Sequence, residues 1–331
     1  MKSAEAVTRA AIRAAAVLVI GVAATASAAA AGLTKPGGYP ERAVSIIVPY
    51  GAGGGSDQVA RAWAKSMQEV TGVPFQVEDK PGGGGLAAMP DFVSRPQDGY
   101  TILQQTDGLI SAGAANQVSF QVGKDVIPIC FTQATFSQIY IRPDETRFTD
   151  WKSFVKYAKA HPGKVTVANI GVQGSMEVVQ MAAITKGAGI KVKEISYDKP
   201  TERYAALLGS QVDALFEQPG DVRQFLQAKQ MKPILTVLKE APKAFAAVPS
   251  LKEAGLNIPV LMRVRGFWAD KRVPAARREY LREACKKAFN TKDYQAFNKK
   301  KYMDLARSYY DGKDAIQLVN DMMDTYRKAA K

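Results

Sequence analysis

The run from Tyr50 to Asp57 holds the residues whose types and spacing best suit ligand binding in this sequence. Glycine permits positive φ and close backbone approach, and Ser56 or Asp57 can cap a helix whose first N–H groups attract an anion. A turn that only caps a helix needs fewer than three successive glycines, so we expect this loop to bind an anion as well. The candidate ligand-binding residues are Tyr50, Ala52, Gly53, Gly54, Gly55, Ser56 and Asp57.

A second loop of the same kind follows another predicted strand further along the chain. Its candidate ligand-binding residues are Asn169, Gly171, Gln173, Gly174 and Ser175. Each helix N-terminus offers unpaired N–H donors and a partial positive charge worth about 0.3–1 kcal/mol toward an anion. Open α/β sheets bind ligands at the carboxyl ends of their strands, so we expect one carboxylate to be held between the two loops.

Two further side chains are candidates for ligand contact. Glu217 ends a predicted strand and can accept a hydrogen bond from a ligand hydroxyl or amine, but a helix cap on the outer rim explains it equally well. Tyr197 and Trp268 either line a pocket that favours aromatic ligands or pack in the core. We keep Glu217 and Tyr197 as ligand-binding candidates.

The sequence offers little for catalysis or metal binding. His161 is the only histidine and lies in a helix-ending turn, where a solvated side chain is typical. Cys130 and Cys285 are too few for a cysteine metal cluster, and sequence separation leaves open whether they form a disulfide. Gly51–Ser56 nearly matches a dinucleotide-binding motif, but an exported protein with one loop histidine is a poor dinucleotide enzyme. We expect no catalytic residue, no metal and no cofactor.

Hydrophobic spacing predicts the elements that must position these loops. The apolar strand at residues 44–48 precedes the first glycine loop and an amphipathic helix, and a second alternating series begins near residue 138. This alternation predicts an α/β fold with parallel strands, and a length of 331 residues favours two domains. We expect domain 1 at residues 32–137 plus 250–331 and domain 2 at residues 138–249, with the ligand cleft between them.

Residues 1–31 are predicted to be a cleaved signal peptide. Lys2, Arg9 and Arg13 precede an Ala-rich apolar stretch, and the Ala-x-Ala site at residues 26–28 follows it. We therefore expect a periplasmic protein. The net charge of +14 is concentrated after Arg263; export makes nucleic acid a poor partner, and solvated helix faces account for the surplus.

An ordered set of motifs resembles the extracytoplasmic solute receptors of tripartite tricarboxylate transporters, which include the Bordetella uptake-gene receptors. The matching segments extend through nearly all of the chain after residue 38. They are Tyr39-Pro40, Ile46 to Asp57, Ala60-Arg61, Val77 to Gly85, Pro96 to Leu103, Pro162 to Lys164, Leu208 to Asp213, Val248 to Gly255 and Gly266 to Ala269.

The resemblance implies a two-lobed periplasmic binding protein (a Venus flytrap), each lobe a mostly parallel sheet flanked by helices. It implies that residues 50–57 and 171–175 hold a small mono-, di- or aromatic carboxylate, partly through ordered water. The implied partners are that carboxylate and the permease subunits of the transporter, with the receptor acting as a monomer. Two alternatives stay open: an exported α/β enzyme that acts on an acidic substrate through Ser175, Asp57 or Glu217, and a receptor that serves a sensor.

Overall fold

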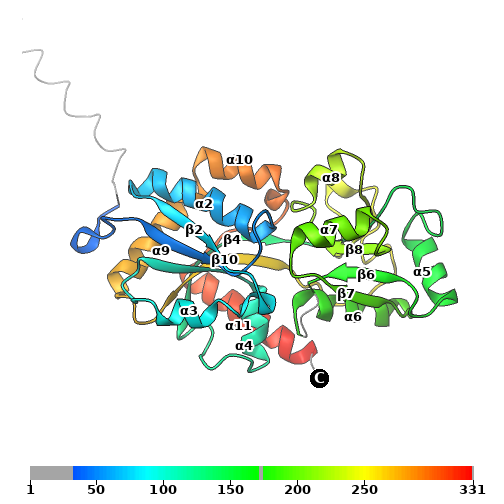
Figure 1. Ribbon diagram of the computed structural model, residues 1–331, viewed down its shortest axis with the longest axis horizontal. Helices are drawn as coiled ribbons and strands as arrows, with labels where there is room; N and C mark the ends of the chain where they lie inside the picture. Colours follow the sequence, from blue (N-terminus) through cyan, green and yellow to red (C-terminus); the bar gives the residue numbers. More distant parts are fainter. Residues whose placement is uncertain (1–32, 171–173, 330–331) are drawn as a thin grey trace, which may run out of the picture. The chain divides into compact units, whose positions relative to one another are not determined.

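Two β-sheets organise the chain in the computed structural model, which describes residues 33–170 and 174–329 (Figure 1). The predicted signal peptide lies outside these residues. The first sheet has the strand order β11-β4-β10-β3-β1-β2. Its strands are β1 (Val44–Val48), β2 (Phe75–Asp79), β3 (Thr101–Thr106), β4 (Val126–Thr135), β10 (Arg263–Asp270) and β11 (Tyr310–Asp311).

The second sheet is built from the middle of the chain and has the strand order β7-β6-β8-β5-β9. Its strands are β5 (Gln138–Ile141), β6 (Thr166–Asn169), β7 (Lys193–Ser196), β8 (Ala214–Glu217) and β9 (Lys232–Thr236). The chain passes from the first sheet to the second between β4 and β5, and it returns between β9 and β10.

The two-lobed α/β architecture that the sequence predicts is confirmed, but the strand pairing is mixed. β1 pairs in parallel with β2 and β3, and β6 pairs in parallel with β7 and β8. β10 enters antiparallel between β3 and β4, and β5 enters antiparallel between β8 and β9. These insertions follow from the crossings between sheets, because a strand that arrives from the other sheet is not constrained by a βαβ crossover.

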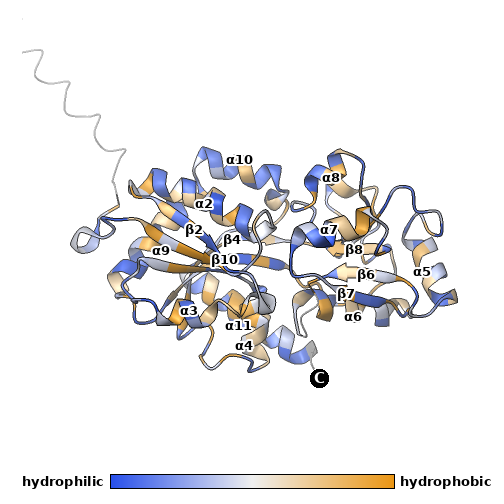
Figure 2. Cartoon of the chain, in the orientation of Figure 1, coloured by the Kyte–Doolittle hydropathy of each residue, from blue (hydrophilic) through white to orange (hydrophobic). Residues whose placement is uncertain are grey.

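Helices flank both sheets, and hydrophobic residues concentrate in the sheets while outer helices such as α10 are largely hydrophilic (Figure 2). The α-helices are α2 (Gly55–Thr71), α3 (Met89–Ser94), α4 (Asp107–Ala114), α5 (Trp151–Ala160), α6 (Met176–Ala188), α7 (Pro200–Leu208), α8 (Arg223–Gln227), α9 (Ala275–Phe289), α10 (Lys292–Lys300) and α11 (Gly312–Ala329). Short 3₁₀ helices occupy Pro36–Gly38, Gly83–Gly85, Lys243–Phe245 and Met303–Leu305. None of the helices at residues 33–170 and 174–329 is long and apolar enough to cross a membrane.

A disulfide joins Cys130 of β4 to Cys285 of α9, with a Cα–Cα distance of 6.6 Å. The sequence left this pairing open because 155 positions separate the two residues. The indole Nε1 of Trp63, on α2, lies 3.2 Å from the Cys285 sulfur, and its ring stacks on Phe267 of β10. The bond therefore fixes α9 to the first sheet, beside the aromatic core of that sheet.

Candidate functional site

Residues from both lobes line one small cavity of about 30 Å³, and several of the lining side chains are charged. Its walls are Tyr50, Gly54, Gly55, Ser56, Thr106, Ile170, Asp198, Pro200, Arg203, Glu217, Gln218, Asp221, Arg263 and Arg265. A volume of this size admits about one water molecule, so a ligand of several carbon atoms requires the walls to move apart. Of the residues that the sequence predicts for ligand contact, Tyr50, Gly54, Gly55, Ser56 and Glu217 line this cavity.

The first predicted loop leads into α2, but neither Ser56 nor Asp57 caps that helix as the sequence suggested. The N-cap is Gly54, which makes no side-chain capping bond, and the helix begins at Gly55. Asp57 lies one turn further on, and its carboxylate reaches back to accept a hydrogen bond from the Gly53 N–H at 2.8 Å. Its other oxygen lies 2.6 Å from Nε of Arg61, so Asp57 stabilises the loop rather than lining the cavity.

Gly53 and Gly54 are glycines for different structural reasons. Gly53 has φ +77°, a left-handed conformation that favours glycine, and its position is exposed. Gly54 has an ordinary φ of −74°, but a Cβ there would lie 2.7 Å from Cγ of Pro200, on α7 beside the second sheet. Gly54 is therefore required by a close approach between the two lobes. Ala52, like Gly53, is exposed and does not line the cavity.

Tyr50 closes the cavity on the side of the first sheet. Its hydroxyl donates to Oε1 of Gln105 at 2.8 Å and lies 2.7 Å from Oγ1 of Thr106. Burial raises the pKa of Tyr50 to about 12, so the phenol stays protonated and keeps its hydrogen to donate.

The second predicted loop is only partly described, because Gly171 and Gln173 lie outside the described residues. Ser175 is the N-cap of α6, and its side chain accepts a hydrogen bond from the Val178 N–H at 3.4 Å. Gly174 has φ +80°, which explains the glycine there. Neither residue lines the cavity, which receives Ile170 from this loop.

Asn169 and Tyr197 also lie away from the cavity walls. Asn169 is fully buried, and its amide donates to the Glu194 carboxylate on the neighbouring strand β7. Tyr197 is half-buried and packs against the hydrophobic cluster formed by α7, β8 and neighbouring residues. Trp268 is fully buried and packs edge-on against Phe131 in the first sheet, so both aromatic rings that the sequence singled out serve packing.

Glu217 lines the cavity as a paired carboxylate. Its Oε2 lies 2.5 Å from Nη2 of Arg203 and accepts a hydrogen bond from the Tyr204 hydroxyl at 3.1 Å. Both residues belong to α7, so the second lobe neutralises this charge by itself. A buried carboxylate that is already paired does not repel an anionic ligand as an isolated one would.

Arg263 and Arg265 are cavity residues that the sequence reasoning missed. Both lie on β10 and are at least 95% buried, with exposed fractions of 3% and 5%. Arg263 pairs with Asp107 at 2.8 Å and with Glu177 of α6, whereas Arg265 pairs with Asp221 at 2.6 Å. Side chains two positions apart lie on the same face of a strand, so the spacing of Arg263 and Arg265 in the sequence could have indicated a charged site on β10.

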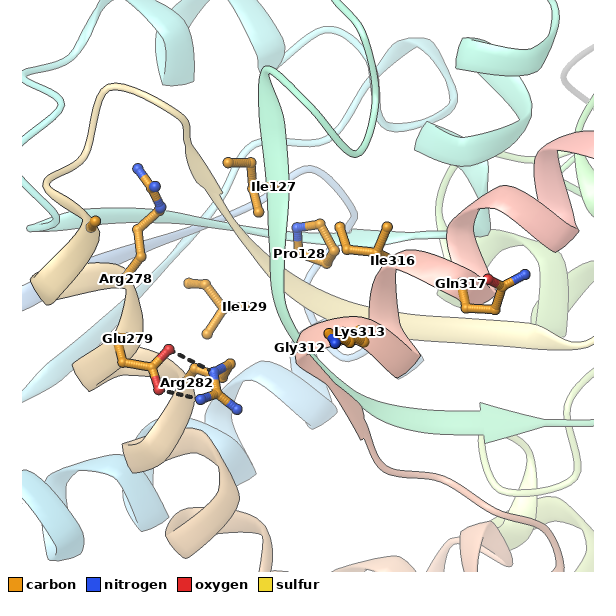
Figure 3. Close-up of a pocket in the computed structure, with 11 residues that line it drawn as sticks. Ile127, Pro128, Ile129, Arg278, Glu279, Arg282, Gly312, Lys313, Ile316 and Gln317 are labelled. Carbon is orange, nitrogen blue, oxygen red and sulfur yellow. Dashed lines mark hydrogen bonds and ion pairs between the residues drawn. The ribbon is translucent and has the colours of Figure 1, made fainter.

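A larger hollow, with a volume of about 830 Å³, lies on the first lobe between α9, α11 and the start of β4 (Figure 3). Ile127, Pro128 and Ile129 form one wall, and Ile316 of α11 forms another. Arg282 donates from Nε to the Glu279 carboxylate at 2.9 Å at its rim. We call this hollow the α9–α11 groove; no residue that the sequence predicts for ligand contact lines it.

Comparisons with known proteins agree with this architecture. Residues 59–330 match the family described as "Tripartite tricarboxylate transporter family receptor". The "UPF0065 protein in gbd 5'region" of Cupriavidus necator is 28% identical over 257 residues, which are 78% of this chain and 77% of that protein.

Two solved structures share the fold. "MatC (Rpa3494) from Rhodopseudomonas palustris with bound malate" superposes with a TM-score of 0.77 at 22% identity, covering 88% of this chain and 100% of that one. "R. palustris Rpa4515 with adipate" superposes with a TM-score of 0.77 at 18% identity, covering 88% of this chain and 97% of that one.

Proposed function

We propose that this chain, which belongs to the tripartite tricarboxylate transporter receptor family, captures a small carboxylate in the periplasm and delivers it to a membrane permease. Members of this family are solute-binding receptors and not enzymes, and this chain is a solute-binding protein with their two-lobed fold. The ligand is a mono-, di- or aromatic carboxylic acid, and the permease is that of a tripartite tricarboxylate transporter.

The observation that carries this proposal is the polar cavity between the two sheets. The N-terminal turn of α2 presents Gly55 and Ser56 to it, and the first N–H groups of a helix attract an anion. Three guanidinium groups also line its walls, and guanidinium matches carboxylate geometry well. Malate in one protein of this fold and adipate in another are consistent with a carboxylate ligand.

We propose that residues 32–137 with 250–331 form one moving body and that residues 138–249 form the other. The ligand enters while the bodies are apart and is enclosed when they close. In this view residues 50–57 and 171–175 face each other across the ligand, and binding shifts the population toward the closed arrangement.

Native mass spectrometry of freshly purified protein tests the function directly. We expect a copurified organic acid, released on denaturation, whose re-addition to stripped protein raises the melting temperature. Conversion of that acid into a new product would favour an exported enzyme instead, and a bound solute without a carboxyl group would contradict the carboxylate class.

Export has its own test. We expect the secreted protein to begin between Ala29 and Leu33, because the Ala-rich stretch before that point has the features of a signal peptide. Amino-terminal sequencing of periplasmic material decides it, and retention of Met1 would contradict cleavage.

A further inference from the structure

Each guanidinium of the cavity is already paired with a carboxylate, so an incoming carboxylate that takes both donors of one guanidinium fork has to displace the carboxylate already there. Arg203 holds Glu217 through Nε at 3.2 Å and Nη2 at 2.5 Å, within the second lobe. Arg263 holds two carboxylates, those of Asp107 and Glu177. Arg265 holds one carboxylate, that of Asp221, through Nη2 at 2.6 Å, and the same Nη2 lies 3.4 Å from Oε1 of Gln218. Among the three guanidinium groups, only that of Arg265 holds a single carboxylate through a single hydrogen bond.

The guanidinium of Arg265 has an unused donor on the same side. Its Nε is buried and has no hydrogen-bond partner among the described residues, whereas Nη1 donates to Oε1 of Gln133 at 2.5 Å. Nε and Nη2 together form the side-on fork that binds both oxygens of one carboxylate. Asp221 takes only Nη2, so a ligand carboxylate that used the whole fork would satisfy a buried donor that is now unpaired.

The pair also lies where the first helix attracts anions. A Cβ on Gly55 would collide with the Asp221 carboxylate and with Nη2 of Arg265, so the pair rests directly against the first residue of α2. Arg265 comes from β10 in the first sheet, and Asp221 follows β8 in the second. Asp221 therefore places a carboxylate from one lobe at the anion-binding end of a helix in the other.

Asp221 has a second cation beside it, which gives it an alternative partner. Lys301 is 7% exposed, and its Nζ donates to the carbonyl oxygen of Gly220 at 2.9 Å. No carboxylate lies within ion-pair distance of this ammonium in the described residues. Burial lowers the pKa of Lys301, and the nearby charge of Asp221 opposes that shift. An Asp221 carboxylate displaced from Arg265 would still have this positive charge nearby.

We infer that Arg265 is a specificity-determining residue that binds a carboxylate of the ligand, and that Asp221 is the internal carboxylate which the ligand replaces. This inference rests on the proposed function, because it assigns a binding role within the same cavity. Arg265 is paired with one carboxylate both before and after ligand binding, first that of Asp221 and then that of the ligand. It favours ligands with a carboxylate free to use the whole fork over neutral analogues of the same shape.

The variant Asp221→Asn tests the exchange, with acetate and malate as probes. Asparagine keeps the shape but removes the competing charge, so we expect each probe to bind about 10-fold or more tightly than to the parent protein, by calorimetry and by melting-temperature shift. The matched control is Asp144→Asn, which removes an exposed carboxylate of the same lobe that does not line the cavity. We expect less than about a 2-fold change for the control, since an exposed charge is screened.

A folded Asp221→Asn protein that binds both probes no better than the parent would overturn the exchange, as would an equal gain in Asp144→Asn. If Asp221→Asn does not fold, Arg265→Lys decides. Lysine keeps the positive charge that Asp221 needs but lacks the fork, so we expect the affinity for malate to fall about 10-fold or more. Unchanged malate affinity in that variant would contradict the role of Arg265.

The outcomes separate this inference from the proposed function. A copurified carboxylic acid together with an unaltered Asp221→Asn affinity would leave the receptor function standing and remove the exchange. Tighter acetate binding in Asp221→Asn, with a non-carboxylate solute copurified from the parent protein, would support the exchange chemistry and contradict the proposed ligand class.

Discussion

The cavity between the two sheets and the α9–α11 groove differ both in size and in how their walls are held. The groove measures about 830 Å³ and is lined by isoleucines and a proline together with four charged residues, Arg278, Glu279, Arg282 and Lys313. Its helix α9 is tied to β4 by the disulfide of Cys130 and Cys285. The cavity measures about 30 Å³ and is lined by buried arginines and carboxylates that come from both sheets.

The contrast teaches that size and charge do not coincide in this protein, because the smaller hollow is the one with buried ion pairs in its walls. Burying an ion pair costs desolvation free energy that hydrophobic replacements would avoid, so a cluster of such pairs points to function rather than stability. The groove lies within one lobe and needs no motion to persist. The cavity lies between elements of two lobes, so its volume depends on how closely they approach.

The variant Gly54→Val is the strongest test that the ligand binds in the cavity rather than in the groove. A branched side chain there would meet Pro200 across the cavity and hold the lobes apart, so we expect ligand affinity to fall about 100-fold or more. Calorimetry with the copurified acid measures the loss. The matched control is Gly53→Ala, where no atom lies within 4 Å of the added Cβ but φ is +77°.

We expect the Gly53→Ala control to lose roughly 1–2 kcal/mol of unfolding free energy while keeping its ligand affinity. A folded Gly54→Val protein with parental affinity would mean that the ligand is held elsewhere.

Removing the disulfide tests whether the region of the α9–α11 groove contributes to stability without affecting ligand binding. We expect the double variant Cys130→Ala and Cys285→Ala to lose roughly 2–5 kcal/mol of unfolding free energy, since the bond closes a long loop in the unfolded chain. Neither cysteine lines the cavity, so affinity for the acid should not change. Denaturant unfolding measures the stability, and calorimetry measures the affinity. Complete loss of binding by a folded variant would show that ligand binding in the cavity depends on the disulfide beside the α9–α11 groove.

Ser175→Ala should have a smaller effect. The hydroxyl caps α6 through a long bond of 3.4 Å and does not line the cavity, so we expect a loss of about 0.5–1 kcal/mol in unfolding free energy. Affinity should change by less than about 3-fold. A much larger loss of affinity, with the melting temperature nearly unchanged, would place this hydroxyl on the ligand in the closed protein.

The smallest effect is expected in the groove itself. Lys313 is an exposed residue of its wall, and Lys313→Ala should change both stability and affinity for the acid by no more than about 0.5 kcal/mol. Melting curves and calorimetry measure both. A clear loss of affinity in this variant would mean that the groove and the cavity are coupled, and the contrast between them would need revision.

The sequence alone determined the elements whose signal is local. The apolar run Val44–Val48 was predicted as a strand with the bounds that the structure has, because hydrophobic periodicity acts within a few residues. The glycines at positions 53–55 marked the first loop correctly for the same reason. The chain order of the family motifs pointed to the two-lobed fold.

Tertiary structure alone decided which residues meet. The sequence reasoning did not identify β4 as a strand, and its Pro128 argues against a central strand. That proline is tolerated because it falls where the pairing with β10 is irregular and a missing N–H costs little. Arg265 and Asp221 are 44 positions apart and belong to different lobes, so no local pattern links them. The charge pairing of the cavity is set by how the two sheets pack together, and a single sequence carries no record of such distances.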